Sequence, residues 1–163
     1  MKTRNFFLSL FFSLIVVSFV SCDKPDTFSY KGYGAGVLVV CEGAFGSNNG
    51  AITFISDSAV TQDVFSAINS RPLGDVVQSF TKGKETGYIV VNNSQKIECV
   101  DLETFESVGA IKGLSFPRYA LVHDNDYVYV TNGNGYAGDF VYVINQNTLE
   151  IEACGCQLGA IES

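Results

Sequence analysis

Short apolar runs separated by polar turns follow one another through the chain, most clearly between Gly87 and Tyr119. Tyr88–Val91 is β-branched and aromatic, and Ser107–Ile111 is a weaker apolar run. Between them, Lys96–Val100 alternates polar and apolar residues, which suits a strand with one face buried. The Asn-, Ser- and Asp-rich segments between these runs are typical of turns. The stretch therefore predicts three consecutive short β-strands.

The same pattern returns about 40 residues further along the chain. Residues 126–132 repeat residues 86–92, and residues 140–145 repeat the second strand and its turn. The offset grows because the hairpin at residues 133–138 is longer than its counterpart. An imperfect copy also lies upstream. A period of about 40–45 residues with four short strands per unit is typical of a β-propeller blade.

We therefore predict an all-β fold of about three four-stranded blades over residues 36–163, with strands named a to d in each blade. The first blade lacks strand a, and propellers need about four blades or more. We accordingly expect an incomplete propeller, which is a fragment, the product of a truncated gene, or a domain completed by something else. The predicted strands are 37–41, 51–55 and 59–63 in the first blade, 76–80, 88–91, 96–100 and 107–111 in the second, and 119–122, 127–131, 140–144 and 150–154 in the third.

The first 21 residues predict an export signal. Lys2 and Arg4 precede an apolar core of about 15 residues, which is shorter than the roughly 20 residues of a membrane span. The core ends in a small residue directly before Cys22, which resembles a bacterial lipoprotein signal and implies cleavage before Cys22 and lipidation of that residue. The alternative is an ordinary secretory signal. Residues 22–35 are polar and Gly-rich, which predicts a flexible tether.

Composition and charge exclude some partners. The formal net charge is −7, and it becomes −9 without Lys2 and Arg4. No basic patch is present, which argues against nucleic acid and against electrostatic docking on anionic lipid, so the lipid anchor is the expected membrane contact.

Four phrases of the chain resemble one family. They are CEGAFGSNNGAITFIS, DVFSAINSRPLGDVVQSF, GYIVVNNSQKIECVDLETF and LSFPRYALV, which are similar to the YncE-like seven-bladed propeller lipoproteins of Bacteroidetes. The resemblance covers only the N-terminal part of that family's length. Some members, of the BtuG type, capture vitamin B12 beside TonB-dependent outer-membrane transporters. The resemblance thus implies a surface-exposed outer-membrane lipoprotein that binds a small molecule.

The turns between strands b and c, and those between strand d and the next strand a, are expected to share one edge of the propeller. These turns are rich in amide and aromatic side chains, which suit a neutral, amide-bearing ligand such as a corrinoid. Asn and Gly are also ordinary hairpin residues, so each residue alone has a turn role as its alternative. The candidate ligand-binding residues are Phe45, Asn49, Asn69, Arg71, Asn92, Asn93, Arg118, Tyr119, Asn132 and Tyr136.

Catalytic and metal motifs are weak. The G-x-G-x-x-G at residues 133–138 lies in a predicted hairpin and lacks the helix that a dinucleotide needs. His123 has no predicted catalytic or metal partner, and no cofactor is expected. Cys41, Cys99, Cys154 and Cys156 allow three complete disulfide pairings, which the sequence does not distinguish, although small buried hydrophobic roles are favoured.

Three functions follow from these observations. The first is a surface module that binds a small nutrient, with cobalamin and a TonB-dependent transporter as the expected ligand and partner. The second is a truncated remnant without function, or a surface protein with a structural or protein-binding role. The third is a propeller enzyme, which is disfavoured because no nucleophile and base or metal cluster is visible. We therefore expect a binding protein and not an enzyme.

Overall fold

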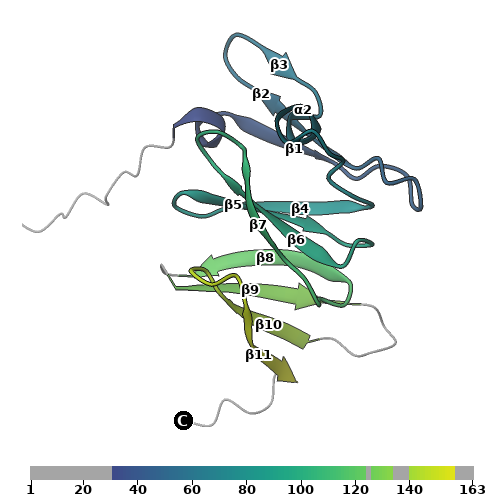
Figure 1. The fold of residues 1–163 in the computed structure, drawn as a ribbon, viewed down its shortest axis with the longest axis vertical. Coiled ribbons are helices and arrows are strands. Elements are labelled where there is room, and N and C mark those ends of the chain that lie inside the picture. Colours follow the sequence, from purple (N-terminus) through teal and green to yellow (C-terminus); the bar gives the residue numbers. More distant parts are fainter. Residues whose placement is uncertain (1–30, 124–125, 134–139, 157–163) are drawn as a thin grey trace, which may run out of the picture.

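The computed structural model describes residues 31–123, 126–133 and 140–156, which fold into three antiparallel sheets stacked one after another (Figure 1). We call these sheets blades 1, 2 and 3 in chain order. The predicted propeller-type repeat is confirmed.

Blade 1 has three strands, in the order β1-β2-β3. This agrees with the prediction that the first blade lacks strand a. Its strands are β1 (Val37–Cys41), β2 (Ala51–Ile55) and β3 (Val60–Thr61). The first two match the predicted bounds, and β3 is shorter than predicted.

Blades 2 and 3 have four strands each, in the orders β4-β5-β6-β7 and β8-β9-β10-β11. Every predicted strand of these blades is present, and most extend the predicted run by one to three residues. Their bounds are β4 (Val77–Lys82), β5 (Thr86–Val91), β6 (Lys96–Asp101), β7 (Ser107–Ile111), β8 (Pro117–His123), β9 (Tyr127–Asn132), β10 (Phe140–Asn145) and β11 (Ile151–Cys156).

The sequence repeat is also a repeat of turn chemistry. Between β6 and β7, Oδ1 of Asp101 accepts hydrogen bonds from the backbone N–H groups of Glu103 and Thr104, each at 2.8 Å. Between β10 and β11, Oδ1 of Asn145 accepts from the equivalent groups of Asn147 and Thr148. Asp and Asn both close such turns through their side-chain oxygen. This shared role explains why the two blades keep one turn with different residues.

Helix α2 (Val64–Asn69) was not predicted, because the segment before Leu73 was assigned to a loop and Asp63 to a strand. Asp63 caps the helix, since its side chain accepts a hydrogen bond from the N–H of Ser66 at 3.4 Å. Val64 and Phe65 are fully buried. Six residues are too few to show helical periodicity in the sequence, so packing in the core between blades 1 and 2 determines this helix.

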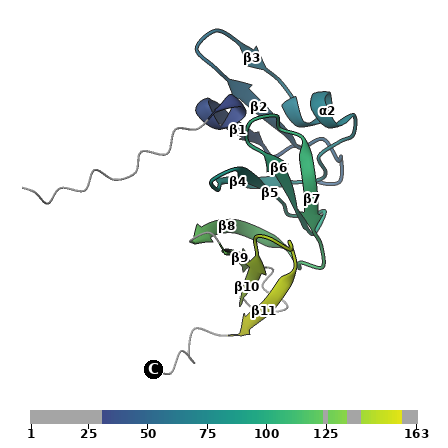
Figure 2. The ribbon, with the colours of Figure 1, turned by 60° about the vertical axis from the view of Figure 1, so that its left-hand side comes forward.

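Two apolar cores lie between the stacked sheets (Figure 2). The core between blades 2 and 3 contains Tyr88, Val90, Ile97, Cys99, Ile111, Leu114, Val128, Val130, Tyr142 and Ile144. The core between blades 1 and 2 contains Ile52, Val64, Phe65, Leu73, Val77, Ile89, Val91, Val100 and Phe105. Blade 2 is therefore buried on both faces, and the prediction of one exposed face for its strand β6 was wrong.

The end of the predicted tether is part of the fold. Gly32–Ala35 forms the 3-10 helix η2, in which Gly34 is buried. The ring of Tyr33 lies 4.7 Å from that of Phe54 and 5.2 Å from that of Phe105, measured between centroids. Residues 1–30, with the predicted signal and Cys22, lie outside the described residues. Neither helix within the described ranges is long and apolar enough to cross a membrane.

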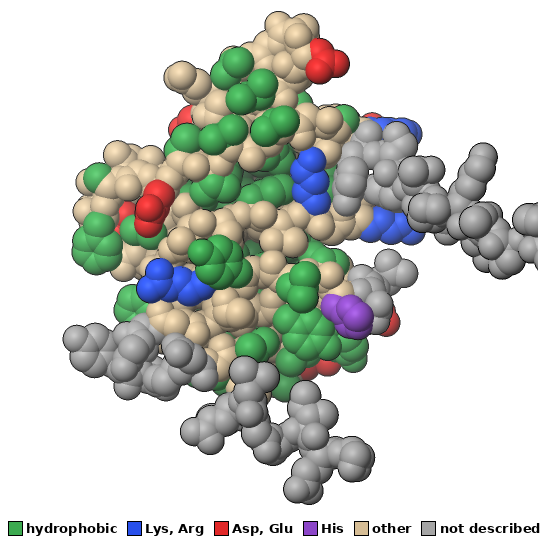
Figure 3. Space-filling view, turned by 180° about the vertical axis from the view of Figure 1, so that it is seen from behind, with side chains coloured by type: hydrophobic (Ala, Val, Ile, Leu, Met, Phe, Trp, Pro, Cys, Tyr) green, Lys and Arg blue, Asp and Glu red, His purple; other side chains and the backbone are tan. Residues whose placement is uncertain are grey.

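The two outer faces of the stack carry exposed apolar side chains (Figure 3). On blade 1, Val37, Ile55 and Val60 lie side by side across the three strands, and all three are exposed. On blade 3, Leu121, Tyr129 and Val143 lie side by side across β8, β9 and β10. In Figure 3 these regions are the green groups over blade 1 and around the one histidine. We call them end face 1 and end face 3.

Candidate binding rim

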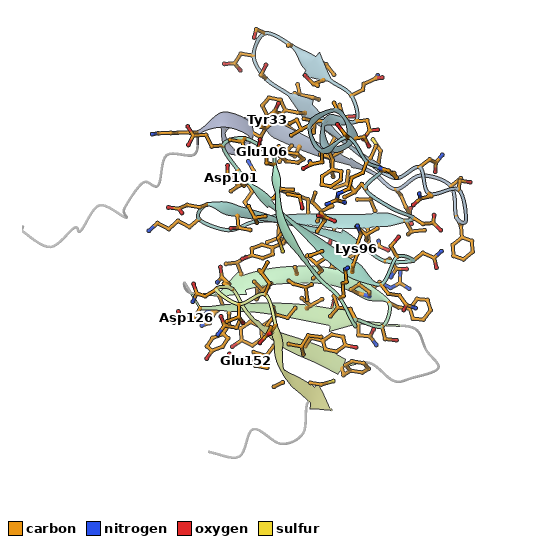
Figure 4. The ribbon with its side chains drawn as sticks, in the orientation of Figure 1. Tyr33, Lys96, Asp101, Glu106, Asp126 and Glu152 are labelled. Carbon is orange, nitrogen blue, oxygen red and sulfur yellow. The ribbon has the colours of Figure 1, made fainter. Side chains whose placement is uncertain are left out.

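The loops that were predicted to share one edge do meet. Gly50 pairs with Gly74, and the N–H of Val77 donates to the carbonyl of Glu42, so the β1–β2 loop lies against the segment before β4. The N–H of Asp75 donates to Oγ of Ser94 in the β5–β6 loop at 2.9 Å. Figure 4 shows Lys96, which follows that loop, on the side opposite Asp101 and Asp126. We call the edge formed by residues 42–50, 70–76, 92–95 and 112–118 the rim.

Asp75 lies where three rim loops converge, and only 9 % of it is exposed. Its Oδ2 accepts hydrogen bonds from the backbone N–H of Gly46 at 2.9 Å and from Nδ2 of Asn93 at 2.5 Å. Its Oδ1 is buried and has no hydrogen-bond partner among the described residues. A buried polar atom without a partner is costly, so this oxygen would be stabilised by a donor that entered between the three loops.

The Asp75 carboxyl is held in its charged form. The hydrogen bond from Asn93 lowers its pKa below the ordinary value, burial acts in the opposite direction, and the backbone N–H groups of Gly46, Asn48 and Val76 lower it further. The rim thus presents a carboxylate at neutral pH, which attracts N–H, O–H and cationic donors. No group of three or more His, Cys, Asp or Glu side chains gathers as a metal site anywhere in the described ranges.

The backbone beside Asp75 is in an uncommon conformation. Val76 has a φ of 58°, which is unfavourable for a β-branched residue. Phe116 holds the equivalent place directly before β8, with a φ of 49°. Because blades 2 and 3 both contain this turn, its backbone conformation is a feature of the blade repeat. It is therefore not evidence for binding at the rim.

Two predicted site residues hold the fold together, although the side chain of Arg71 is also 42 % exposed. Arg71 donates to both carboxylate oxygens of Glu98, at 3.2 Å and 2.5 Å, and its guanidinium lies 4.8 Å from the ring centroid of Phe65. Asn69 donates to the carbonyls of Phe65 and Phe105 and accepts from the N–H of Ser107. These contacts tie α2 to blade 2.

Three further predicted residues join neighbouring loops. Asn92 is buried and its Nδ2 donates to the carbonyl of Pro117 at 2.9 Å, linking blades 2 and 3. Asn93 holds Asp75, as described above. Arg118 is exposed, and its Nε donates to the carbonyl of Gly133 at 3.1 Å. Of these three, Arg118 is the exposed rim residue that could meet a ligand.

The remaining candidates are spread over several places. Phe45 is 80 % exposed on the β1–β2 loop, where Oδ1 of Asn49 accepts from the N–H of Ala44 and closes the turn. Tyr119 is exposed on end face 3, and Asn132 is buried at the end of β9. Tyr136, like Cys22, lies outside the described residues. The structure therefore brings together Phe45, Asn93 and Arg118 on one edge, with Asp75 as the residue that the sequence analysis did not select.

A shallow hollow of about 270 Å³ lies at the edge opposite the rim. It is lined by Lys84, Glu85, Thr86, Tyr88, Gln146 and Asn147. The hydroxyl of Tyr88 donates to Oε1 of Gln146 at 3.1 Å, and burial raises the pKa of Tyr88 to about 12. None of the predicted site residues lines this hollow.

Cys41, Cys99 and Cys154 are free thiols. Cys99 is fully buried, and burial, followed by the nearby charge of Glu98, raises its pKa to about 12. The thiolate is the reactive form of cysteine. In native protein at pH 8 we expect iodoacetamide to modify the exposed Cys41 while Cys99 stays unmodified until the chain unfolds. Peptide mass spectrometry checks this, and equal labelling of the two thiols would contradict the burial of Cys99.

The fold is similar to known propellers. No family model and no curated protein matches the chain. Hydrazine synthase from Kuenenia stuttgartiensis superposes with a TM-score of 0.58 at 16 % identity, over 83 % of this chain and 37 % of that one. The WD40 β-propeller domain of Doa1 superposes with a TM-score of 0.50 at 19 % identity, over 76 % of this chain and 41 % of that one. The chain is thus a β-propeller-type protein that spans less than half of either neighbour's chain.

Proposed function

We propose that this chain forms part of a lipid-anchored surface protein that binds a small, neutral, amide-bearing molecule on the rim. Cobalamin is the expected ligand, and a TonB-dependent outer-membrane transporter is the expected recipient. The lipoprotein-like signal before Cys22 and the family resemblance support the location and the partner.

The observation that carries the proposal is the buried Oδ1 of Asp75 without a partner among the described residues. Because this oxygen is buried, the loops around Asp75 would move apart for a primary amide of the ligand to donate its N–H to it. The exposed ring of Phe45 and the guanidinium of Arg118 lie on the same edge and would supply apolar contact and a donor. An amide-bearing ligand uses all three groups, whereas an anionic ligand would be repelled by Asp75.

Titration calorimetry with cyanocobalamin tests the proposal. Asp75→Asn removes the charge but keeps the size of the side chain, so we expect binding to weaken by about tenfold, because a hydrogen bond to a charged group contributes about 1.5 kcal/mol or more. The matched control is Asp57→Asn, which changes an exposed acid in the β2–β3 turn and should leave the affinity unchanged.

A second ligand separates amide recognition from general adhesion. A corrinoid whose peripheral amides are hydrolysed to carboxylates should bind at least about tenfold more weakly, because its charges face the Asp75 carboxylate. Equal affinity for both corrinoids would contradict the role of Asp75. The absence of heat with either would contradict the choice of cobalamin.

A further inference from the structure

The two end faces are built like the interfaces inside the stack. Within the stack, alternate residues of β9 and β10, such as Val128 and Ile144, pack on the apolar residues of blade 2. The other set, which includes Tyr129 and Val143, forms end face 3 together with two residues of β8, Leu121 at 64 % exposed and Tyr119 at 60 % exposed. Blade 3 thus has two apolar faces, and one of them is solvent-exposed.

End face 1 has the same character. Val37 is 60 % exposed and Val60 is 63 % exposed, and Val39 and Ile55 are partly exposed beside them. Strand alternation directs Leu38 and Val40 of β1 toward the core between blades 1 and 2, so the exposed valines point away from it. Exposed apolar patches of this kind mark interaction sites.

We infer that a second copy of this chain covers both faces, with end face 1 of each copy packed on end face 3 of the other. A twofold axis relates the copies and makes the two junctions equivalent, so the pair closes; the same contact without that axis would grow into an open assembly. The pair then contains six blades, which lies within the range of about four to eight found in propellers.

The buried area favours a closed pair over a single contact. A sheet of three to four strands, about 4.8 Å apart and five to six residues long, covers about 300 Å². One junction therefore buries about 600 Å² in total, which is the size of a crystal-packing contact. Two junctions bury about 1,200 Å², which reaches the range of specific interfaces.

The test is the solution mass of the chain by size-exclusion chromatography with light scattering. The chain carries Cys22→Ser throughout, so that no lipid on that residue drives association. We expect twice the mass of one chain at several concentrations. Val39→Glu and Leu121→Lys each place a charge at both junctions and should each give monomers. The matched control, Val108→Glu, changes an exposed valine of β7 away from both end faces and should leave the pair intact.

Mixing the two monomeric variants provides the decisive step. In a mixed pair, one junction carries both substitutions, so that the introduced glutamate faces the introduced lysine, and the other junction is unchanged. We therefore expect the pair to form again on mixing, which also shows that both variants are folded. A monomeric parent chain, a pair broken by only one variant, no recovery on mixing, or assemblies that grow with concentration would each overturn the inference. A monomeric parent would leave the end faces to a partner other than a second copy.

Discussion

Replacing Phe105 by Ala should lower the free energy of unfolding by about 3–5 kcal/mol, the usual cost of emptying a buried aromatic site. Phe105 is fully buried in the core between blades 1 and 2. Its ring lies 5.2 Å from that of Tyr33 and 6.4 Å from that of Phe80, so η2 and β4 both lose a contact. Urea denaturation followed by far-UV circular dichroism measures the change.

Leu149→Ala is the matched control for Phe105→Ala. Leu149 occupies the equivalent turn position in blade 3, and its φ of 59° is close to the 63° of Phe105. Backbone strain is therefore similar in both variants, and the difference reports side-chain packing. Because Leu149 is only half-buried, we expect a smaller loss of about 1–2 kcal/mol. Equal losses would show that Phe105 does not anchor the core.

The second large effect concerns Glu98, which is 1 % exposed. Arg71 and Lys96 both pair with its carboxylate, and the hydroxyl of Ser107 donates to it at 2.6 Å. Removing one partner of a buried charge costs about 3–5 kcal/mol, and Lys96 remains, so we expect Arg71→Met to cost about 3 kcal/mol. The double variant Arg71→Met with Glu98→Met should recover most of this loss, since it removes the buried charge as well. A double variant less stable than the single one would contradict this account.

The pH dependence of unfolding gives an independent measure of the same pair. Burial raises the pKa of Glu98, but hydrogen bonds from Arg71, Lys96 and Ser107 lower it by more, so the folded-state pKa lies below the ordinary 4.5. Glu98 therefore contributes stability above about pH 4.5, and this contribution is lost as the pH falls through the folded-state pKa. The double variant should lack this component of acid destabilisation, and an unchanged acid profile would contradict it.

The blade repeat could be predicted because local chemistry encodes it. The β-branched runs at Tyr88–Val91 and Tyr127–Thr131 predict strands wherever they fold, and the turns at Asp101 and Asn145 are closed by their own side chains. Such features depend on neighbours in the chain, so the sequence contains them directly.

The candidate site could be predicted only as an edge. Turn composition indicated which loops meet, but it did not show that Arg71 and Asn69 make contacts that hold the fold together. Asp75 was missed because nothing near it in sequence distinguishes it: its partners Gly46 and Asn93 are 29 and 18 residues away. An oxygen becomes unpartnered only once the three loops are in place.

By itself, the sequence determined the strands, their grouping into blades, the absence of strand a from blade 1, and the edge where the polar loops gather. Only the tertiary structure decided that β6 is buried on both faces, that residues 64–69 are helical, and that Glu98 is a buried charge with two cationic partners. The physical reason is that strand and turn preferences arise from adjacent residues, whereas burial and charge pairing depend on which blade packs against which.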